Sequence, residues 1–202
     1  MAYGQAYLQL EGRRLRTLML EWLRVENERS DFQVQAREQE ISLNIAPLEI
    51  KLRVDRIDRL ADGSQLIIDY KSGRCDVKDW LGDRPSKPQL LLYGIATASD
   101  PQAQTVSALG FAQVRARDCA YVGAGCVAAA PGIRTDIVKL VGEKIQAEDW
   151  ESLNKAWREI LEQLVANFVA GDAAVDPLST SSCSYCGLES FCRIGDEMEI
   201  PG

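Results

Sequence analysis

The sequence predicts an α/β fold, and two observations support this prediction. Helix-like and strand-like segments follow one another in the order helix, strands, helix, strands, helix. Near the middle of the chain, a segment that alternates strictly between apolar and polar residues precedes a short apolar run. Alternation indicates a strand with one exposed face, whereas a short continuous apolar run indicates a buried strand. A sheet covered by helices follows from this order.

The first half of the chain is expected to hold one helix and three strands. Residues 5–28 carry apolar side chains at helical spacing among Arg and Glu, which predicts an amphipathic helix. Residues 32–45 alternate on both sides of a polar break and are closed by Pro47, which is typical of strands. Residues 48–60 and 65–70 are the alternating segment and the apolar run, and a turn signal at residues 61–64 joins them into a predicted β-hairpin.

The second half alternates helices and strands. Residues 74–88 are rich in Gly, Pro and polar residues, which predicts a loop with at most one helical turn. Residues 89–97 predict a buried helix after a proline, residues 106–114 and 120–127 two strands, and residues 148–169 a well-patterned helix. The tail from residue 171 is loop-like and carries cysteines.

Composition limits the function classes. With 202 residues, 46% of them hydrophobic and 26% charged, the chain can bury one substantial core. It has neither an apolar run of the roughly 20 residues a membrane span needs nor a signal-like N-terminus, so we expect a cytoplasmic protein without membrane contact. The absence of histidine leaves carboxylates, lysine, cysteine or a bound metal for any catalysis. The net charge of −7 argues mildly against a nucleic-acid partner without excluding one.

The predicted hairpin brings two acids together. If its turn is centred on Asp62, Asp55 lies opposite Asp69, with Cβ atoms about 4.5 to 5.5 Å apart. Asp69 and Lys71 share a face of the strand, and Tyr70 points away. Two carboxylates this close repel each other unless a cation lies between them, and oxygen ligands suit Mg²⁺ or Mn²⁺. With a lysine as hydrogen-bond donor, the parts match phosphodiester hydrolysis.

A plainer alternative exists for part of this set. Asp55 and Asp58 are also what an exposed antiparallel strand would carry, paired with neighbouring arginines. Asp69 fits this alternative poorly because it ends an apolar run, where α/β sheets place their ligands. Candidate phosphate contacts are Arg53, Arg56, Arg59, Arg74, Lys78 and Arg84, although solvated surface charge also explains each of them.

The motif Asp55, then Asp69-Tyr70-Lys71-Ser72-Gly73, then Gln89 and Tyr93 closely resembles the PD-(D/E)XK nuclease superfamily. Within it, the sequence is similar to the RecB-like and AddB-like branch and to CRISPR-associated exonucleases with an iron-sulfur cluster, from about residue 38 to residue 192. The resemblance implies a restriction-endonuclease-like core, with a mixed central β-sheet flanked by α-helices. It also implies DNA as substrate, a helicase domain or subunit as partner, and a role in DNA repair and recombination.

The resemblance assigns a role to each matching residue. Asp55 and Asp69 correspond to the two metal-binding acids, the Tyr70 carbonyl oxygen to a further ligand, and Lys71 to the catalytic lysine. Gln89 and Tyr93 correspond to the helical Q-x3-Y element beside the site, and a plain helix start with a core tyrosine is the alternative.

The sequence departs from the family pattern in one respect. RecB-like nucleases begin with a G-x3-H element whose histidine completes the metal site, and this sequence has no histidine. Either the N-terminal part of the domain lies outside the sequence or the ligand is lost, so the isolated chain is expected to bind metal weakly and cut poorly. A catalytically silent, nuclease-like DNA-binding or scaffolding module is therefore the competing hypothesis.

Three cysteines follow the last predicted helix. Cys183, Cys186 and Cys192 form a C-x2-C-x5-C motif that can bind a cluster or a zinc ion. We expect residues 1–176 to form the nuclease core, with its N-terminus truncated, and residues 177–202 to form a cysteine-bearing tail. In the relatives, a triplet of this kind joins an upstream cysteine around a [4Fe-4S] cluster.

The upstream cysteine of that set is not evident. The remaining cysteines, Cys75, Cys119 and Cys126, lie in a loop and in strand-like segments and are expected to be core or surface residues. The cluster is therefore expected to be absent or incomplete here. Free thiols, an adventitious disulfide or a zinc-stabilised protein remain alternatives.

Overall fold

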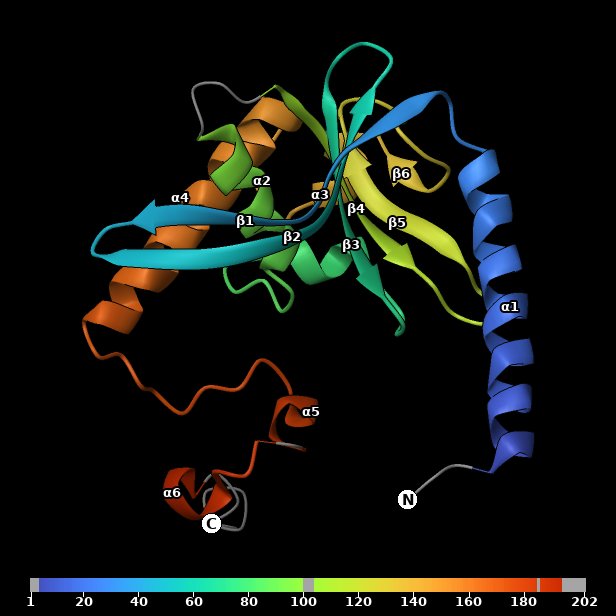
Figure 1. Cartoon of the computed structure of the whole chain (residues 1–202). Coiled ribbons are helices and arrows are strands. Elements are labelled where there is room, and N and C mark those ends of the chain that lie inside the picture. The colour runs from blue at the N-terminus through green and yellow to red at the C-terminus, as the bar shows by residue number, and fades with distance from the viewer. Residues whose placement is uncertain (1–3, 100–103, 185, 194–202) are drawn as a thin grey trace. The chain divides into compact units, whose positions relative to one another are not determined.

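The computed structural model describes residues 4–99, 104–184 and 186–193 (Figure 1). The chain divides into two compact units, residues 1–162 and residues 163–202. The first unit contains a six-stranded sheet with the strand order β1-β2-β3-β4-β5-β6. The strands are β1 Phe32–Ile45, β2 Leu48–Leu60, β3 Gln65–Lys71, β4 Val106–Gln113, β5 Ala120–Gly125 and β6 Ile133–Arg134.

The sheet is mixed, as predicted. β2 pairs with β1 and β3 in antiparallel fashion, β3 runs parallel to β4, β4 is antiparallel to β5, and β5 is parallel to β6. The two central strands are the most apolar: β3 is buried from Gln65 to Asp69 and β4 along its whole length. Strands covered on both faces need continuous apolar sequence, which explains why residues 65–70 lack alternation.

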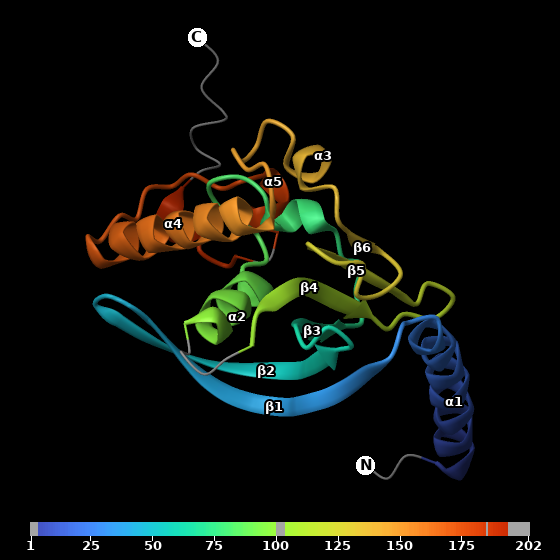
Figure 2. The same cartoon turned by 90° about the horizontal axis from the view of Figure 1, so that it is seen from above.

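Helices cover both faces of this sheet (Figure 2). On one face lie η1 Val77–Trp80, α2 Gln89–Ala98, and the part of α4 Trp150–Val169 that belongs to the first unit. α4 is anchored by Trp157, which is fully buried and donates from Nε1 to the Trp80 carbonyl oxygen at 3.1 Å. This face and its helices form the main core, which carries the catalytic candidates at its edge.

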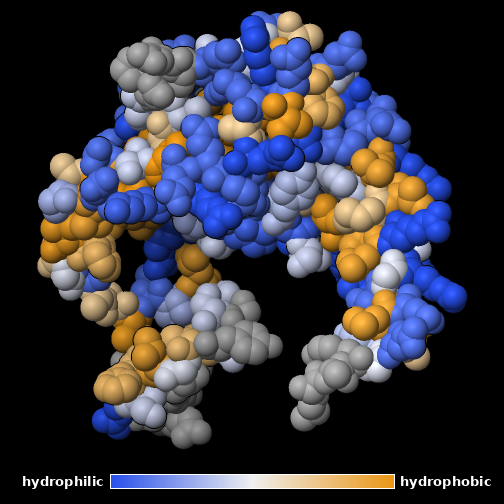
Figure 3. Space-filling model, viewed as in Figure 1, coloured by the Kyte–Doolittle hydropathy of each residue, from blue (hydrophilic) through white to orange (hydrophobic). Residues whose placement is uncertain are grey.

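The helix α1 Gln5–Asn27 covers part of the other face. Its one buried residue is Trp22, which is 6% exposed and packs with Leu66 and Ile68 of β3 and Tyr121 of β5. Most of its other apolar side chains are exposed, and Figure 3 shows apolar atoms along this helix among charged ones. The predicted amphipathic helix is present. Among the described residues, only its last turns pack against the sheet, and most of the apolar side chains before them are exposed.

Two short elements were not expected from the sequence: β6 and α3 Ile137–Val141. They span two and five residues, which is too short for hydrophobic periodicity to reveal them. In the second unit, the tail that was predicted to be loop-like contains two single helical turns, α5 Thr180–Cys183 and α6 Glu189–Cys192. Within the described ranges, no helix combines the length and apolar character that crossing a bilayer requires.

Candidate active site

The carboxylate of Asp69 lies where the buried part of β3 ends. Asp69 is 1% exposed, whereas the next two residues of the strand, Tyr70 and Lys71, are partly exposed. Burial raises the pKa of the Asp69 carboxyl, contact with Lys71 lowers it, and the negative charge of Asp55 raises it again. The fold therefore holds a carboxylate in an environment that disfavours its charge.

Lys71 is the cation nearest to this carboxylate. Its Nζ atom lies 2.6 Å from Asp69 Oδ2 as an ion-pair partner and donates to Gln89 Oε1 at 2.8 Å. Despite this proximity, no residue that the structure describes gives Asp69 Oδ2 a hydrogen bond of normal geometry. This buried oxygen contacts the Lys71 ammonium, and a carboxylate oxygen beside one cation still has lone pairs for a further ligand.

Asp55 faces Asp69 across the hairpin. The β2–β3 register pairs Arg56 with Ile68 and Ile57 with Ile67, as predicted, and its extension by one residue sets Asp55 opposite Asp69. Asp55 is half-buried, and its Oδ2 accepts a hydrogen bond from the Tyr70 backbone N–H at 2.8 Å. The structure thus brings both acids to one side of the hairpin.

Helix α2 adds the two remaining candidates. Gln89 donates from Nε2 to the Tyr93 hydroxyl, while its Oε1 accepts from Lys71. Tyr93 is 2% exposed, and its pKa is raised by burial and by the charges of Asp69 and Asp55. The burial of Tyr93 fits the alternative of a core tyrosine. The hydrogen bond between Gln89 and Lys71 does not fit the alternative of a plain helix start, because a helix start needs no contact with a lysine of a distant strand.

A protein-family comparison identifies the family of this chain. The family model described as the PD-(D/E)XK nuclease superfamily matches residues 2–193. The chain belongs to the PD-(D/E)XK nuclease superfamily. No curated protein matches the chain. The mixed sheet flanked by helices is consistent with the restriction-endonuclease-like fold expected of this superfamily.

Members of this superfamily typically use divalent metal ions, and the residues present fit one. Over the described ranges, no three His, Cys, Asp or Glu side chains gather closely enough to bind a metal. A cation here would therefore draw on two carboxylates, the Tyr70 carbonyl oxygen and water, which is a donor set that suits Mg²⁺. The closeness of the Asp55 and Asp69 carboxylates, whose repulsion helps to raise the pKa of Asp69, is the observation that supports this fit.

Two polar residues near the nuclease site were missed from sequence. Gln113, at the end of β4, is 4% exposed and accepts from the Cys75 backbone N–H at 2.9 Å, which fixes the loop that leaves Lys71. Lys87 pairs with Asp79 at 2.7 Å in the same loop region. A large polar residue at the end of a strand of mostly apolar and small residues is the signal that would have identified Gln113.

The structure corrects one set of surface candidates. Arg56 is 9% exposed and Asp58 is fully buried, and the two form an internal ion pair, so neither lies on a solvated face. Arg56 is therefore not a phosphate contact. Arg53 and Arg74 have exposed side chains, with Arg53 paired to Glu38 at 2.5 Å, and remain available to a polyanion.

The cysteine triplet lies in the second unit of the nuclease chain. Cys183, Cys186 and Cys192 line one hollow of about 490 Å³ together with Leu188 and Phe191. They are not gathered around a common centre, since the described residues include no metal-binding group of three such side chains. Cys75, Cys119 and Cys126 are in the first unit, in the partly or fully exposed positions expected of core-edge and surface residues.

Proposed function

We propose that the chain is a metal-dependent deoxyribonuclease that hydrolyses phosphodiester bonds at Asp55, Asp69 and Lys71, with Gln89 and Tyr93 as supporting residues. Superfamily membership suggests hydrolysis of nucleic acid. The observation that supports these residues is the convergence of two facing acids, one of them buried, beside a lysine held by Gln89. A purely structural ion pair would not need the second acid.

Each side chain has a distinct task in this proposal. Asp55, Asp69 and the Tyr70 carbonyl oxygen would hold Mg²⁺ or Mn²⁺, which when bound supplies Lewis-acid stabilisation and lowers the pKa of water. Lys71 Nζ donates a hydrogen bond to the attacking water or to the charge that develops on a phosphoryl oxygen. Gln89, itself held by Tyr93, keeps the Lys71 ammonium directed at the carboxylates.

The finer assignment rests on resemblance. The Asp69-Tyr70-Lys71 and Gln89–Tyr93 motifs support a RecB-like or AddB-like protein that acts in the cytoplasm with a helicase partner in DNA repair and recombination. The C-x2-C-x5-C motif of Cys183, Cys186 and Cys192 is the feature that supports a [4Fe-4S] cluster, which would need these thiols to gather around one centre and a fourth ligand.

A catalytically silent DNA-binding or scaffolding module is the second candidate. The absence of histidine and the net charge of −7 favour it. The buried carboxylate of Asp69 disfavours it, because Asp55 adds a second negative charge beside it, and a site that binds no cation gains nothing from that repulsion.

Cleavage of linear single- and double-stranded DNA with Mg²⁺ or Mn²⁺ tests the proposal. Asp69→Ala and Lys71→Ala are expected to lower the rate by about 100-fold or more, because each removes electrostatic stabilisation of the transition state. Asp62→Ala and Lys155→Ala are matched controls at exposed positions, in the hairpin turn and on α4, and should cut like the wild type.

Three results distinguish the candidates. Loss of cutting in the two site variants alone supports the proposed site. Equal cutting by the wild type and both site variants rules it out. DNA binding without cutting by the wild type favours the silent module.

A further inference from the structure

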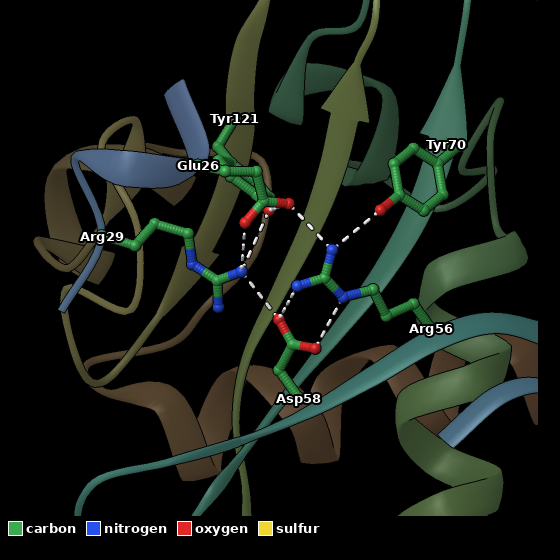
Figure 4. A network of polar contacts seen from close by, with 6 residues as sticks. All are labelled: Glu26, Arg29, Arg56, Asp58, Tyr70 and Tyr121. Atoms are coloured by element: carbon green, nitrogen blue, oxygen red, sulfur yellow. Dashed lines mark hydrogen bonds and ion pairs between the residues drawn. The ribbon is translucent and has the colours of Figure 1, made fainter. Parts of the chain in front are cut away.

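Figure 4 shows a cluster of charged and polar side chains that includes Arg56 and Tyr70. Because these two residues directly follow Asp55 and Asp69 in their strands, the cluster lies on the opposite face of the hairpin from the candidate site. It consists of Glu26 from α1, Arg29 from the segment after α1, Arg56 and Asp58 from β2, Tyr70 from β3 and Tyr121 from β5. The side chains of Arg29 and Asp58 are 0% exposed, and those of Arg56 and Glu26 are 10% exposed. The two cations and two anions balance, as burial of charge requires.

Arg56 is the residue that joins this cluster to the site strands. Its Nε and Nη2 atoms donate to Asp58 Oδ1 and Oδ2 at 2.6 and 2.9 Å, a bidentate arrangement that fixes the guanidinium plane. Its Nη1 atom then donates to Glu26 Oε1 at 2.8 Å and to the Tyr70 hydroxyl at 2.9 Å. Tyr70 is thus held at its ring end by a guanidinium whose own orientation is fixed.

The contact between Arg56 and Tyr70 lies at the end of the β2–β3 pairing that is nearer to the candidate site. Toward the site, the last pair in the β2–β3 register is Arg56 with Ile68. Beyond it, Tyr70 connects the two strands twice: its backbone N–H donates to Asp55 Oδ2 at 2.8 Å, and its hydroxyl accepts from Arg56. Arg56 directly follows Asp55, and Tyr70 lies between Asp69 and Lys71. Neighbouring residues of a strand face opposite sides of the sheet. The contact between Arg56 and Tyr70 on one side therefore fixes the positions of Asp55 and Asp69 on the other.

We propose that the hydrogen bond from Arg56 to Tyr70 is a positioning clamp that holds the ends of β2 and β3 together, and so sets Asp55 against Asp69 and aims the Tyr70 carbonyl oxygen. Arg56 and Tyr70 are positioning residues, because they act through the neighbours that would hold the metal. The consequence for metal affinity rests on the proposed function, whereas the effect on the strand ends does not.

Two single-hydroxyl deletions separate positioning from simple support of the fold. Tyr70→Phe removes the acceptor for Arg56 and leaves the ring. Tyr121→Phe is the matched control: its hydroxyl belongs to the same cluster, where it accepts from Arg29 and donates to Glu26, but it comes from β5 and not from a site strand. Tyr121 is 2% exposed and its hydroxyl makes two of these bonds, whereas Tyr70 is 39% exposed, so Tyr121→Phe should lower thermal stability at least as much as Tyr70→Phe.

The first measurement uses metal-free protein and amide hydrogen exchange. The clamp predicts that exchange at residue 70 becomes at least about tenfold faster in Tyr70→Phe, since local opening of the strand end is easier, and that it stays within about twofold in Tyr121→Phe. The second measurement is Mn²⁺ affinity by electron paramagnetic resonance. Tyr70→Phe is expected to weaken it about tenfold, in line with losses of ligand-orienting partners, and Tyr121→Phe is expected to leave it unchanged.

Equal exchange at residue 70 in the two variants would overturn the clamp, whatever the protein does to DNA. Faster exchange in Tyr70→Phe with unchanged Mn²⁺ affinity would overturn its role in the metal site. If the wild type neither binds Mn²⁺ nor cuts DNA, the proposed function fails, and the exchange comparison still decides whether the clamp holds the strand ends.

Discussion

Asp69 is held almost out of water, and this placement costs the metal-free protein stability. Burial raises the pKa of the Asp69 carboxyl above its value in the unfolded chain, so the folded state binds the proton more tightly. The stability that this proton contributes is complete below the unfolded pKa and is lost as the pH rises through the raised folded pKa. A bound divalent cation would reverse this loss.

Asp69→Asn is therefore expected to raise the melting temperature of the metal-free protein by a few degrees at neutral pH, because it removes the buried charge and keeps the shape. The gain should shrink toward about pH 4, where an ordinary carboxyl is already largely protonated. Thermal unfolding in EDTA across this pH range measures it. Asp62→Asn, at an exposed turn position, is the control and should not show the same pattern. A destabilised Asp69→Asn at neutral pH would contradict this account.

At the scale of elements, β5 depends on close backbone contact with β4. A Cβ atom added at Gly123 would lie 2.2 Å from the Leu109 carbonyl oxygen and 2.8 Å from the Gly110 Cα atom. Backbone atoms cannot move aside as a flexible side chain does, so the strands would have to separate. Gly12, in the exposed part of α1, has nothing within 4 Å of such an atom.

The same substitution should therefore have opposite effects at these two glycines. Gly123→Ala is expected to lower the free energy of unfolding by about 1–3 kcal/mol through overpacking. Gly12→Ala is expected to raise it by about 0.5–1 kcal/mol, because alanine has the higher helix propensity. Urea denaturation measures both changes. A neutral Gly123→Ala would mean that β5 and β4 approach each other less closely than the structure shows.

At the scale of the whole molecule, charge opposes the proposed substrate. The chain carries 30 acidic and 23 basic residues, and the two facing acids of the site would meet a phosphate backbone of the same sign. A cation bound between them changes the local sign of the charge that DNA encounters. DNA binding should accordingly depend on divalent metal more than on the basic surface residues.

Ca²⁺, a poorer catalyst of the same ligand class, is expected to strengthen DNA binding by the wild type at least about tenfold over EDTA, which corresponds to 1.4 kcal/mol. Asp69→Asn should bind DNA more tightly than the wild type in EDTA and gain little from Ca²⁺. Fluorescence anisotropy with labelled DNA measures both. Equal binding by the wild type in EDTA and in Ca²⁺ would show that the site does not contact the phosphates.

The sequence predicted the hairpin and its register because both depend on local rules. Alternation over residues 48–55, the turn at residues 61–64 and the apolar run after it favour one pairing that buries the apolar side chains. The facing of Asp55 and Asp69 follows from that register. The proximity of Gln89 to Lys71 came from the resemblance, since nothing local in residues 74–88 indicates where α2 packs.

By itself, then, the sequence determined the order of the main elements, the mixed character of the sheet through its family motif, and the acids and lysine that meet at the hairpin. Only the tertiary structure decided that Arg56 and Asp58 point into a buried cluster, because that cluster also contains Arg29 and Tyr121, which are 92 positions apart in the sequence. The tertiary structure also decided that Trp22 is the one residue of α1 that is buried against the sheet. The pattern of apolar and polar residues within one strand or helix specifies which of its faces is buried. The residues of a buried polar cluster depend instead on which distant elements pack together.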